Sequence, residues 1–133
     1  MTDITAAKVL ARFYYGSTDF DPASSGKTTV TSYTNVEYII DDVIDFINAE
    51  AGTSILPLAG AAGTKTVTVT TAQNAAIKLV LPVMLKETKY KISTSSSLGA
   101  TSASESIGSQ DPIFQKMFWA AINRLRGSSF DNT

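Results

Sequence analysis

The segment from Thr34 to Gly52, TNVEYIIDDVIDFINAEAG, constrains the fold of this chain more than any other. Its apolar residues recur at intervals of three and four, which places them on one stripe of an α-helix. They are Val36, Ile39, Ile40, Val43, Ile44 and Ile47. Thr34 and Glu37 have the spacing of a capping box, and Gly52 stands where a left-handed C-cap residue is expected. Because isoleucine and valine are weak helix formers, the stripe needs a packed partner.

Further helices are predicted on both sides of this segment. Together the expected helices cover about 4–15, 35–51, 71–92 and 112–126. The TKTVTVT segment at 64–70 alternates strictly and predicts a strand, for which the β-branched run at 28–33 is a candidate partner. We therefore expect a single mainly α domain over 1–133, a three- to four-helix bundle with a short two-stranded β element and long loops.

Local signals predict where these helices begin and end. Thr70 and Gln73 have capping-box spacing, and Asp111-Pro112 supplies an N-cap and a first helical residue. Gly16 and Gly127 are expected to end the first and last helices. The 71–92 helix has almost no polar face, so we expect it to be buried nearly all round, with a kink at Pro82. The apolar loop after Gly52 is expected to tuck three residues under the fold: Ile55, Leu56 and Leu58.

The composition removes several chemistries. The chain of 133 residues has a net charge of −1 and neither Cys nor His, so it lacks thiolate sites and the commonest general base. Charged residues make up 17%, against a typical ~25%. Such a polar-poor surface favours a chain that hides part of itself against other subunits. No apolar run approaches the ~20 residues of a membrane span, and the N-terminus has no basic signal-peptide region.

Two short motifs resemble ligand sites and are better explained otherwise. Ser25-Gly26-Lys27-Thr28 contains the core of a phosphate-binding loop, but Asp21 stands where the first glycine is required. The motif also needs a strand before it and a helix after it, and Pro22 and the following β-branched run do not fit that context. A polar turn is favoured. Asp41, Asp42 and Asp45 have the D-D-x-x-D spacing that holds magnesium diphosphate in large helical enzymes, which carry two such helices. One copy favours a solvated or subunit-facing acidic side. We expect no enzyme, cofactor or metal.

Charged and aromatic residues outside the apolar stripes are candidates for a subunit or partner interface. The acidic candidates, expected on the outer face of the central helix, are Glu37, Asp41, Asp42 and Asp45. The basic candidates, at the ends of the second and third long helices, are Lys86, Lys89, Arg124 and Arg126. Opposed charges of this kind set the register between neighbours in a ring or pair within one chain, and both interpretations are open.

Three apolar candidates complete this set. Trp119 is either a core residue or a partner anchor, because aromatic residues are enriched at interface hot spots. The Ser-rich stretch 93–110 is either a flexible linker or an arm that orders against a neighbour. Leu98 and Ile107 are its only residues able to anchor it.

The order of these elements resembles the head–tail connector proteins of tailed viruses, also called adaptor or head-completion proteins. The likeness rests on VEYIIDDVIDFINAEAG, a Pro-containing loop, the apolar AAIKLVLPVMLKETKY and the final DPIFQKMFWAAINRLRG. Two features depart from the family: TSILPLAG replaces a frequent arginine-tyrosine-proline segment, and the TKTVTVT strand is additional. The family has no catalytic residues to carry over.

The resemblance implies a structural virion protein, assembled in the host cytoplasm and located at the head–tail interface. Its subunits would form a homo-oligomeric ring, commonly twelvefold, between the portal protein and a tail or tail-completion protein. The ring would extend the channel through which genomic DNA passes without sequence-specific binding, and no membrane is involved. The alternative is a small cytoplasmic helical protein-binding module, and a magnesium enzyme using the three aspartates is a third hypothesis.

Overall fold

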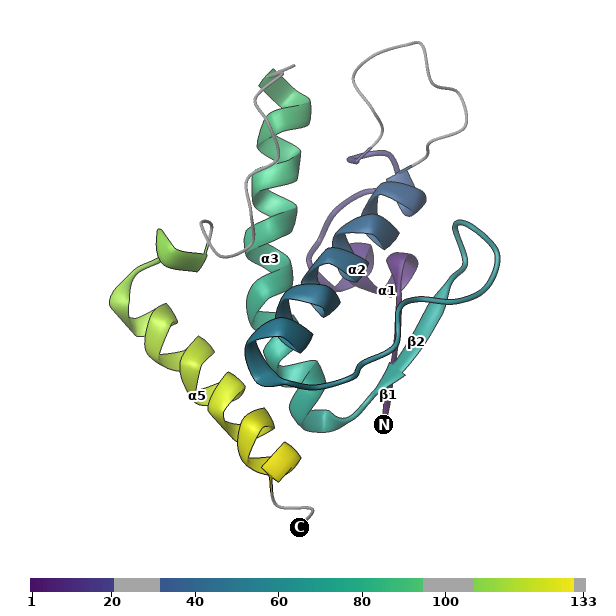
Figure 1. Cartoon of the computed structure of the whole chain (residues 1–133). Helices are drawn as coiled ribbons and strands as arrows, with labels where there is room; N and C mark the ends of the chain where they lie inside the picture. Colours follow the sequence, from purple (N-terminus) through teal and green to yellow (C-terminus); the bar gives the residue numbers. More distant parts are fainter. Residues whose placement is uncertain (21–31, 95–106, 131–133) are drawn as a thin grey trace.

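The computed structural model describes residues 1–20, 32–94 and 107–130. In these parts the chain is mainly helical with a short two-stranded antiparallel sheet, which confirms the predicted fold class (Figure 1). The elements in chain order are β1 Thr2–Thr5, α1 Ala6–Arg12, α2 Ser32–Ala51, β2 Thr66–Val69, α3 Thr71–Thr94 and α5 Pro112–Phe130.

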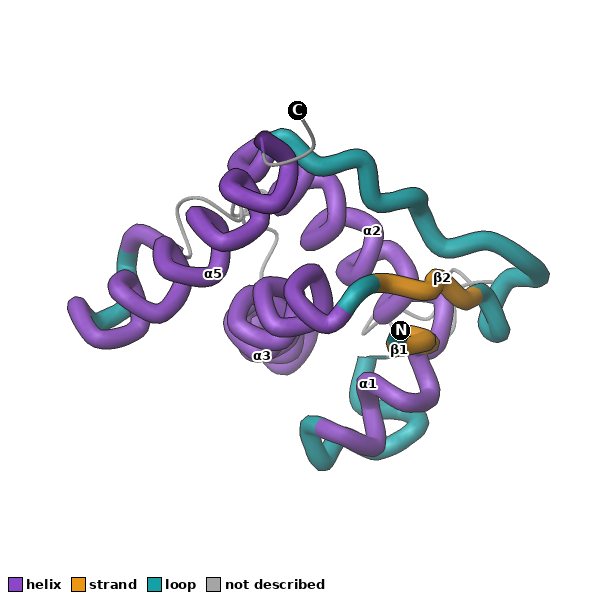
Figure 2. Tube along the Cα trace, turned by 90° about the horizontal axis from the view of Figure 1, so that it is seen from below, coloured by secondary structure: helices purple, strands orange, loops and turns teal. Residues whose placement is uncertain are grey.

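Helix α2 is the centre of the fold and contacts α1, α3 and α5. The view from below shows it between α3 and the loop that leads to β2 (Figure 2). Its predicted apolar stripe is buried in full, and the packed partners that the stripe requires are these three helices. Gly52 follows with a φ of 69°, and its N–H donates to the Asn48 carbonyl over 2.9 Å, which confirms the predicted C-cap.

The start of α2 differs from the prediction. The helix already includes Ser32 and Tyr33, so Thr34 lies inside it and the capping box with Glu37 does not form. Ser32 is buried, and its hydroxyl accepts a hydrogen bond from the Phe20 N–H over 3.0 Å. This long-range bond ties the segment before the helix to its first turn, a contact that local spacing does not reveal.

Strand β2 pairs with β1 at the N-terminus. The antiparallel register sets Ile4 opposite Val67 and Thr2 opposite Val69. Ile4 and both valines are buried, so the sheet covers the core with one face. The predicted alternation of β2 is confirmed. Of the candidate partner run at 28–33, Ser32 and Tyr33 belong to α2 instead, and the other four residues lie outside the described residues.

The N-terminal helix is shorter at both ends than predicted. Thr5 stays extended, and its hydroxyl accepts from the Lys8 N–H over 3.1 Å, so α1 begins only at Ala6. At the other end Tyr14 takes the left-handed conformation at φ 63°, and the Tyr15 N–H donates to the Leu10 carbonyl over 2.9 Å. This is the Schellman arrangement, and it ends the helix before Gly16 is reached.

Helix α3 begins as predicted and is less buried than predicted. The Gln73 N–H donates to the Thr70 hydroxyl over 3.2 Å, and the Thr70 N–H donates to Gln73 Oε1 over 3.0 Å, so the capping box is formed. The helix continues through Pro82. Its buried residues are Ala76, Ile77, Val80, Leu81 and Leu85. Ala75 is exposed, and Leu79, Val83 and Met84 are only half-buried. The neighbouring helices therefore cover only part of the apolar surface of α3.

Helix α5 has the predicted start and a later end. Asp111 Oδ1 accepts from the Phe114 N–H over 2.9 Å, which confirms the N-cap before Pro112. The helix runs past Gly127 to Phe130, so that glycine does not end it. Its buried stripe is Phe118, Ile122 and Leu125.

Some predictions fall outside the described residues. The Gly26-Lys27 motif, the first part of the 28–33 run and Leu98 belong to 21–31 or 95–106. In the loop before β2, Ile55 and Leu58 are buried as expected, while Leu56 is exposed.

Candidate functional site

One flank of α2 holds the loop that leads to β2. Glu37 is only 3% exposed, and its two carboxylate oxygens accept from the Gly63 and Lys65 N–H groups, each over 2.9 Å. Asp41 Oδ1 accepts from the Leu58 N–H over 2.9 Å. Asp41 lies one helical turn after Glu37, and Asn48 lies about three turns after Glu37 on the same flank. We call Glu37, Asp41 and Asn48 the loop-binding flank.

Asn48 makes three hydrogen bonds to the start of that loop. Its Nδ2 donates to the Ile55 carbonyl over 2.9 Å, and its Oδ1 accepts from the Ile55 N–H over 2.9 Å and from the Thr53 hydroxyl over 2.8 Å. The loop thus satisfies its backbone groups on side chains of α2. The expectation of four acids on the outer face is therefore wrong for Glu37, which is buried, and Asp41 is half-buried and engaged with the loop.

The other two acids remain on the solvent side of α2. Asp42 and Asp45 are exposed, as are Tyr38 and Ala49 at the same helical face. We call these four residues the outer stripe. Partial desolvation raises the pKa of Asp42, and the nearby carboxylates of Asp45 and Asp41 raise it further. The outer stripe is therefore a concentration of like charge beside an exposed tyrosine.

Two of the four basic candidates pair within the chain. Lys89 Nζ lies 3.3 Å from Asp19 Oδ1, and the Gly16 N–H together with Lys89 holds the pKa of Asp19 below its ordinary value. Arg126 donates through Nε to the Glu50 carbonyl over 2.7 Å and lies 3.8 Å from its carboxylate. Both residues are therefore paired within the chain, Lys89 with an acid outside α2 and Arg126 with an acid near the end of α2. Lys86 and Arg124 are exposed.

The aromatic candidate lies at the edge of the core. Trp119 is 40% exposed, and its ring meets the buried Phe118 edge-on at 5.0 Å between centroids. The Arg126 guanidinium stands 5.8 Å from the centre of the tryptophan ring.

Ile107 is buried in the core of its own chain, and its carbonyl accepts from Gln115 Nε2. It therefore anchors the end of the 93–110 stretch intramolecularly.

An apolar surface lies on α5 and the adjoining side of α3. Ile113 is 73% exposed and Met117 52%, although both are large apolar side chains. A hollow of about 530 Å³ lies between α3 and α5, and its lining combines Leu79, Pro82, Val83, Tyr90 and Phe114 with the polar Lys86, Glu87 and Gln110. We call this the α3–α5 apolar surface.

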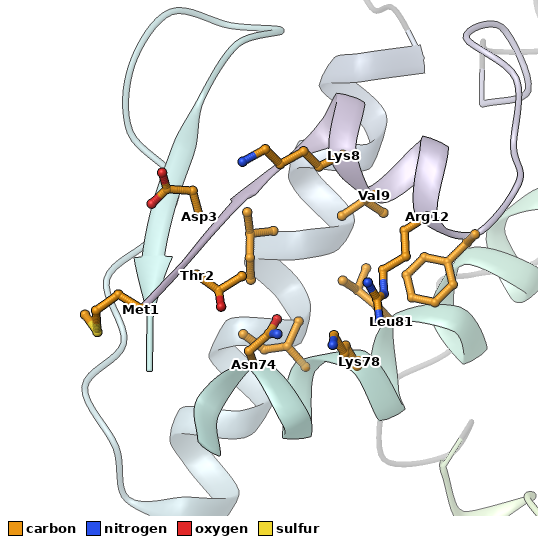
Figure 3. Close-up of a pocket in the computed structure, with 12 residues that line it drawn as sticks. Met1, Thr2, Asp3, Lys8, Val9, Arg12, Asn74, Lys78 and Leu81 are labelled. Atoms are coloured by element: carbon orange, nitrogen blue, oxygen red, sulfur yellow. The ribbon is translucent and has the colours of Figure 1, made fainter. Parts of the chain in front are cut away.

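A second hollow, of about 830 Å³, lies between β1, α1 and α3 (Figure 3). Lys8 and Arg12 stand on its α1 side and Lys78 on its α3 side; the Arg12 side chain extends toward Lys78, and the Lys8 side chain extends toward Asp3. The walls between them include the apolar Val9, Phe13, Ile77 and Leu81 as well as the polar Thr2 and Asn74. We call this the basic hollow.

Sequence reasoning missed the basic hollow. The four-residue spacing of Lys8 and Arg12 was visible and indicates one helical side. Lys78 joins them only because the fold places α3 across the hollow from α1 and β1, and nothing in the local sequence marks that arrangement. The predicted interface set included neither surface as a whole.

In the parts of the chain that the structure describes, no group of three or more Asp, Glu, His or Cys residues is arranged to hold a metal ion. No helix there has the length and apolarity to cross a membrane. No protein-family model, curated protein or solved structure matches the chain.

Proposed function

We propose that this chain is a structural subunit of the head–tail connector of a tailed virus. Copies of it form a ring, commonly twelvefold in such connectors, between the portal protein and the tail or tail-completion protein. The ring extends the DNA channel and offers the platform on which the tail attaches. The protein is then part of the virion.

The observation that carries the proposal is the uncovered α3–α5 apolar surface. Ile113 and Met117 are exposed on the same helix whose other side, at Phe118, is fully buried. A chain with only 17% charged residues has few polar groups with which to offset such a surface. Large side chains exposed next to an apolar hollow are typical of a surface that another protein covers.

The order of elements supports the same assignment. The amphipathic α2, the Pro-containing loop, the apolar α3 and α5, which carries Arg124 and Arg126 in its second half, follow one another as in the connector proteins that the sequence resembles. The loop-binding flank keeps the intervening loop against α2, so the segment that departs from the family motif is held by this chain's own side chains.

Particle composition tests the proposal. Mass spectrometry of purified virions should detect the chain, and electron microscopy of the head–tail junction should show a ring of this fold beneath the portal. Absence of the chain from intact particles would overturn the proposal. In that case the protein-binding module becomes the better hypothesis, and recovery of a stable non-virion complex would support it.

A double variant tests the observation behind the proposal. Ile113→Ser with Met117→Ser should leave the melting temperature nearly unchanged, because both side chains are exposed, and should reduce incorporation into particles. Lys116→Ser is the matched control, since it is an exposed position between them. Normal incorporation of the double variant would show that this surface is not the one that docks.

A further inference from the structure

The basic hollow has an excess of positive charge. Three cations line it, on Lys8, Arg12 and Lys78, against the single carboxylate of Asp3. That carboxylate already accepts a hydrogen bond from the Thr68 hydroxyl over 2.5 Å. The ion pairs found between described residues involve Lys89 and Arg126, so none of the three cations is neutralised by an acid of residues 1–20, 32–94 or 107–130.

The apolar walls narrow the class of ligand. Val9, Ile77 and Leu81 are buried at the base of the hollow, while Phe13 is half-buried at its side. A free inorganic anion would pair with the cations and leave the apolar part of the hollow in contact with water. A ligand that fills the hollow must therefore carry carboxylates and an apolar or aromatic group together.

The outer stripe of α2 has this composition. Tyr38, Asp42, Asp45 and Ala49 follow one another at helical spacing, which sets one aromatic ring, two carboxylates and one small residue on a single face. Tyr38 is 61% exposed. Partial desolvation raises the pKa of Asp42, and the like charges of Asp45 and Asp41 raise it further; an opposing cation would relieve the part that comes from like charge.

The two surfaces lie on opposite sides of the molecule. The buried stripe of α2 faces α1 and α3, and the outer stripe points the other way around the helix axis. The basic hollow is lined by β1, α1 and α3, with α2 behind it (Figure 3). A chain therefore cannot fold its own outer stripe into its own hollow, whereas a second copy can supply it.

We propose that the outer stripe of one copy docks in the basic hollow of the next, head to tail. Asp42 and Asp45 meet Lys8, Arg12 and Lys78, and the Tyr38 ring lies against Phe13. A contact between two different surfaces is heterologous, and it produces a closed ring when the rotation between copies closes. The inference rests on the proposed ring and names the faces that would build it.

Charge reversal tests this pairing. One variant carries Lys8→Glu and Arg12→Glu, a second carries Asp42→Lys and Asp45→Lys, and a third carries all four changes. Self-association of each is measured by sedimentation at high protein concentration and at low and high salt. Lys116→Glu with Arg124→Glu is the control, because it makes the same charge change at exposed positions of α5.

We expect wild-type association to weaken with salt. Each of the first two variants alone should associate at least about tenfold more weakly than wild type, because like charges then meet at the contact. An equimolar mixture of the two should recover association, since each supplies the surface that complements the other. The four-change variant should associate with itself for the same reason.

Four outcomes would overturn the pairing. They are a wild-type chain that stays monomeric under all these conditions, single-surface variants that associate like wild type, a mixture that recovers nothing, and a control that weakens association equally. None of them removes the proposed function, which is decided by virion composition. Circular dichroism checks that each variant is folded. If the Lys8 and Arg12 reversal is unfolded, Lys8→Gln with Arg12→Gln replaces it. If the Asp42 and Asp45 reversal is unfolded, Asp42→Asn with Asp45→Asn replaces it. Association of these neutral variants equal to wild type would also overturn the pairing.

Discussion

Two faces of α2 carry carboxylates of the same kind and use them differently. On the loop-binding flank, Glu37 and Asp41 accept hydrogen bonds from backbone N–H groups of the loop before β2. On the outer stripe, Asp42 and Asp45 are exposed beside each other. The difference teaches that an acid on an amphipathic helix is stabilising when a loop crosses it and supplies donors. Without such a loop it is a repulsive surface charge that suits an external partner.

The strongest test of this comparison is Glu37→Ala. The change removes both oxygens that bind Gly63 and Lys65 and leaves two partly buried N–H groups without acceptors. We expect unfolding free energy to fall by about 3 kcal/mol. Urea denaturation measures it, with Asp45→Ala as the matched exposed control. Glu37→Gln keeps one acceptor oxygen and should cost about half as much. A loss below that of the control would show that Glu37 does not hold the loop.

A smaller effect is expected for Asn48→Ala. The side chain binds both the N–H and the carbonyl of Ile55, so its loss frees the start of the loop from the end of α2. We expect a loss of about 2 kcal/mol. Faster amide exchange should be confined to the loop before β2. Exchange that accelerates equally in α5 would instead indicate global destabilisation.

Asp41→Ala should cost less again, about 1.5 kcal/mol, because one charge-assisted hydrogen bond to Leu58 is lost. The same change also removes one carboxylate next to Asp42, which offsets part of the cost. Thermal unfolding of Asp41→Ala and Asp41→Asn separates the two contributions. If Asp41→Ala is as stable as wild type at neutral pH, the bond to Leu58 contributes nothing net.

The smallest effect, of opposite sign, is expected for Asp42→Asn. The pKa of Asp42 is raised in the folded chain above its ordinary value of 3.8. As pH rises through the window from 3.8 to the folded pKa, the unfolded chain loses this proton first, so stability falls. Asp42→Asn removes that loss and should be more stable than wild type above the window, by less than about 0.5 kcal/mol because solvent screens the charge.

Denaturation at several pH values checks this sign. The advantage of Asp42→Asn should vanish below the window, where the wild-type carboxyl is protonated in both states. A variant less stable than wild type at neutral pH would mean that Asp42 has a stabilising partner in the free chain.

Much of the fold could be predicted from local patterns, while much of the candidate site could not. The apolar stripe of α2, the cap at Gly52 and the Thr70–Gln73 capping box depend on residues a few positions apart, and each is present. The role of Glu37 was mistaken because its donors lie 26 and 28 positions away, and a cap three positions away was the nearer explanation. Ile113 and Met117 fit an apolar stripe, yet packing leaves them exposed.

The amino-acid sequence alone determined which segments are helical, which side of α2 is apolar and three of the caps, at Gly52, at Thr70–Gln73 and at Asp111. These properties follow from side-chain periodicity and from hydrogen bonds within a turn or two. Only the tertiary structure decided that β1 is the partner of β2, that Lys89 and Arg126 are paired internally, and that Lys78 joins Lys8 and Arg12 around one hollow. The physical reason is that strand pairing and charge pairing depend on which distant segments come together, and a single chain's local pattern allows several such pairings.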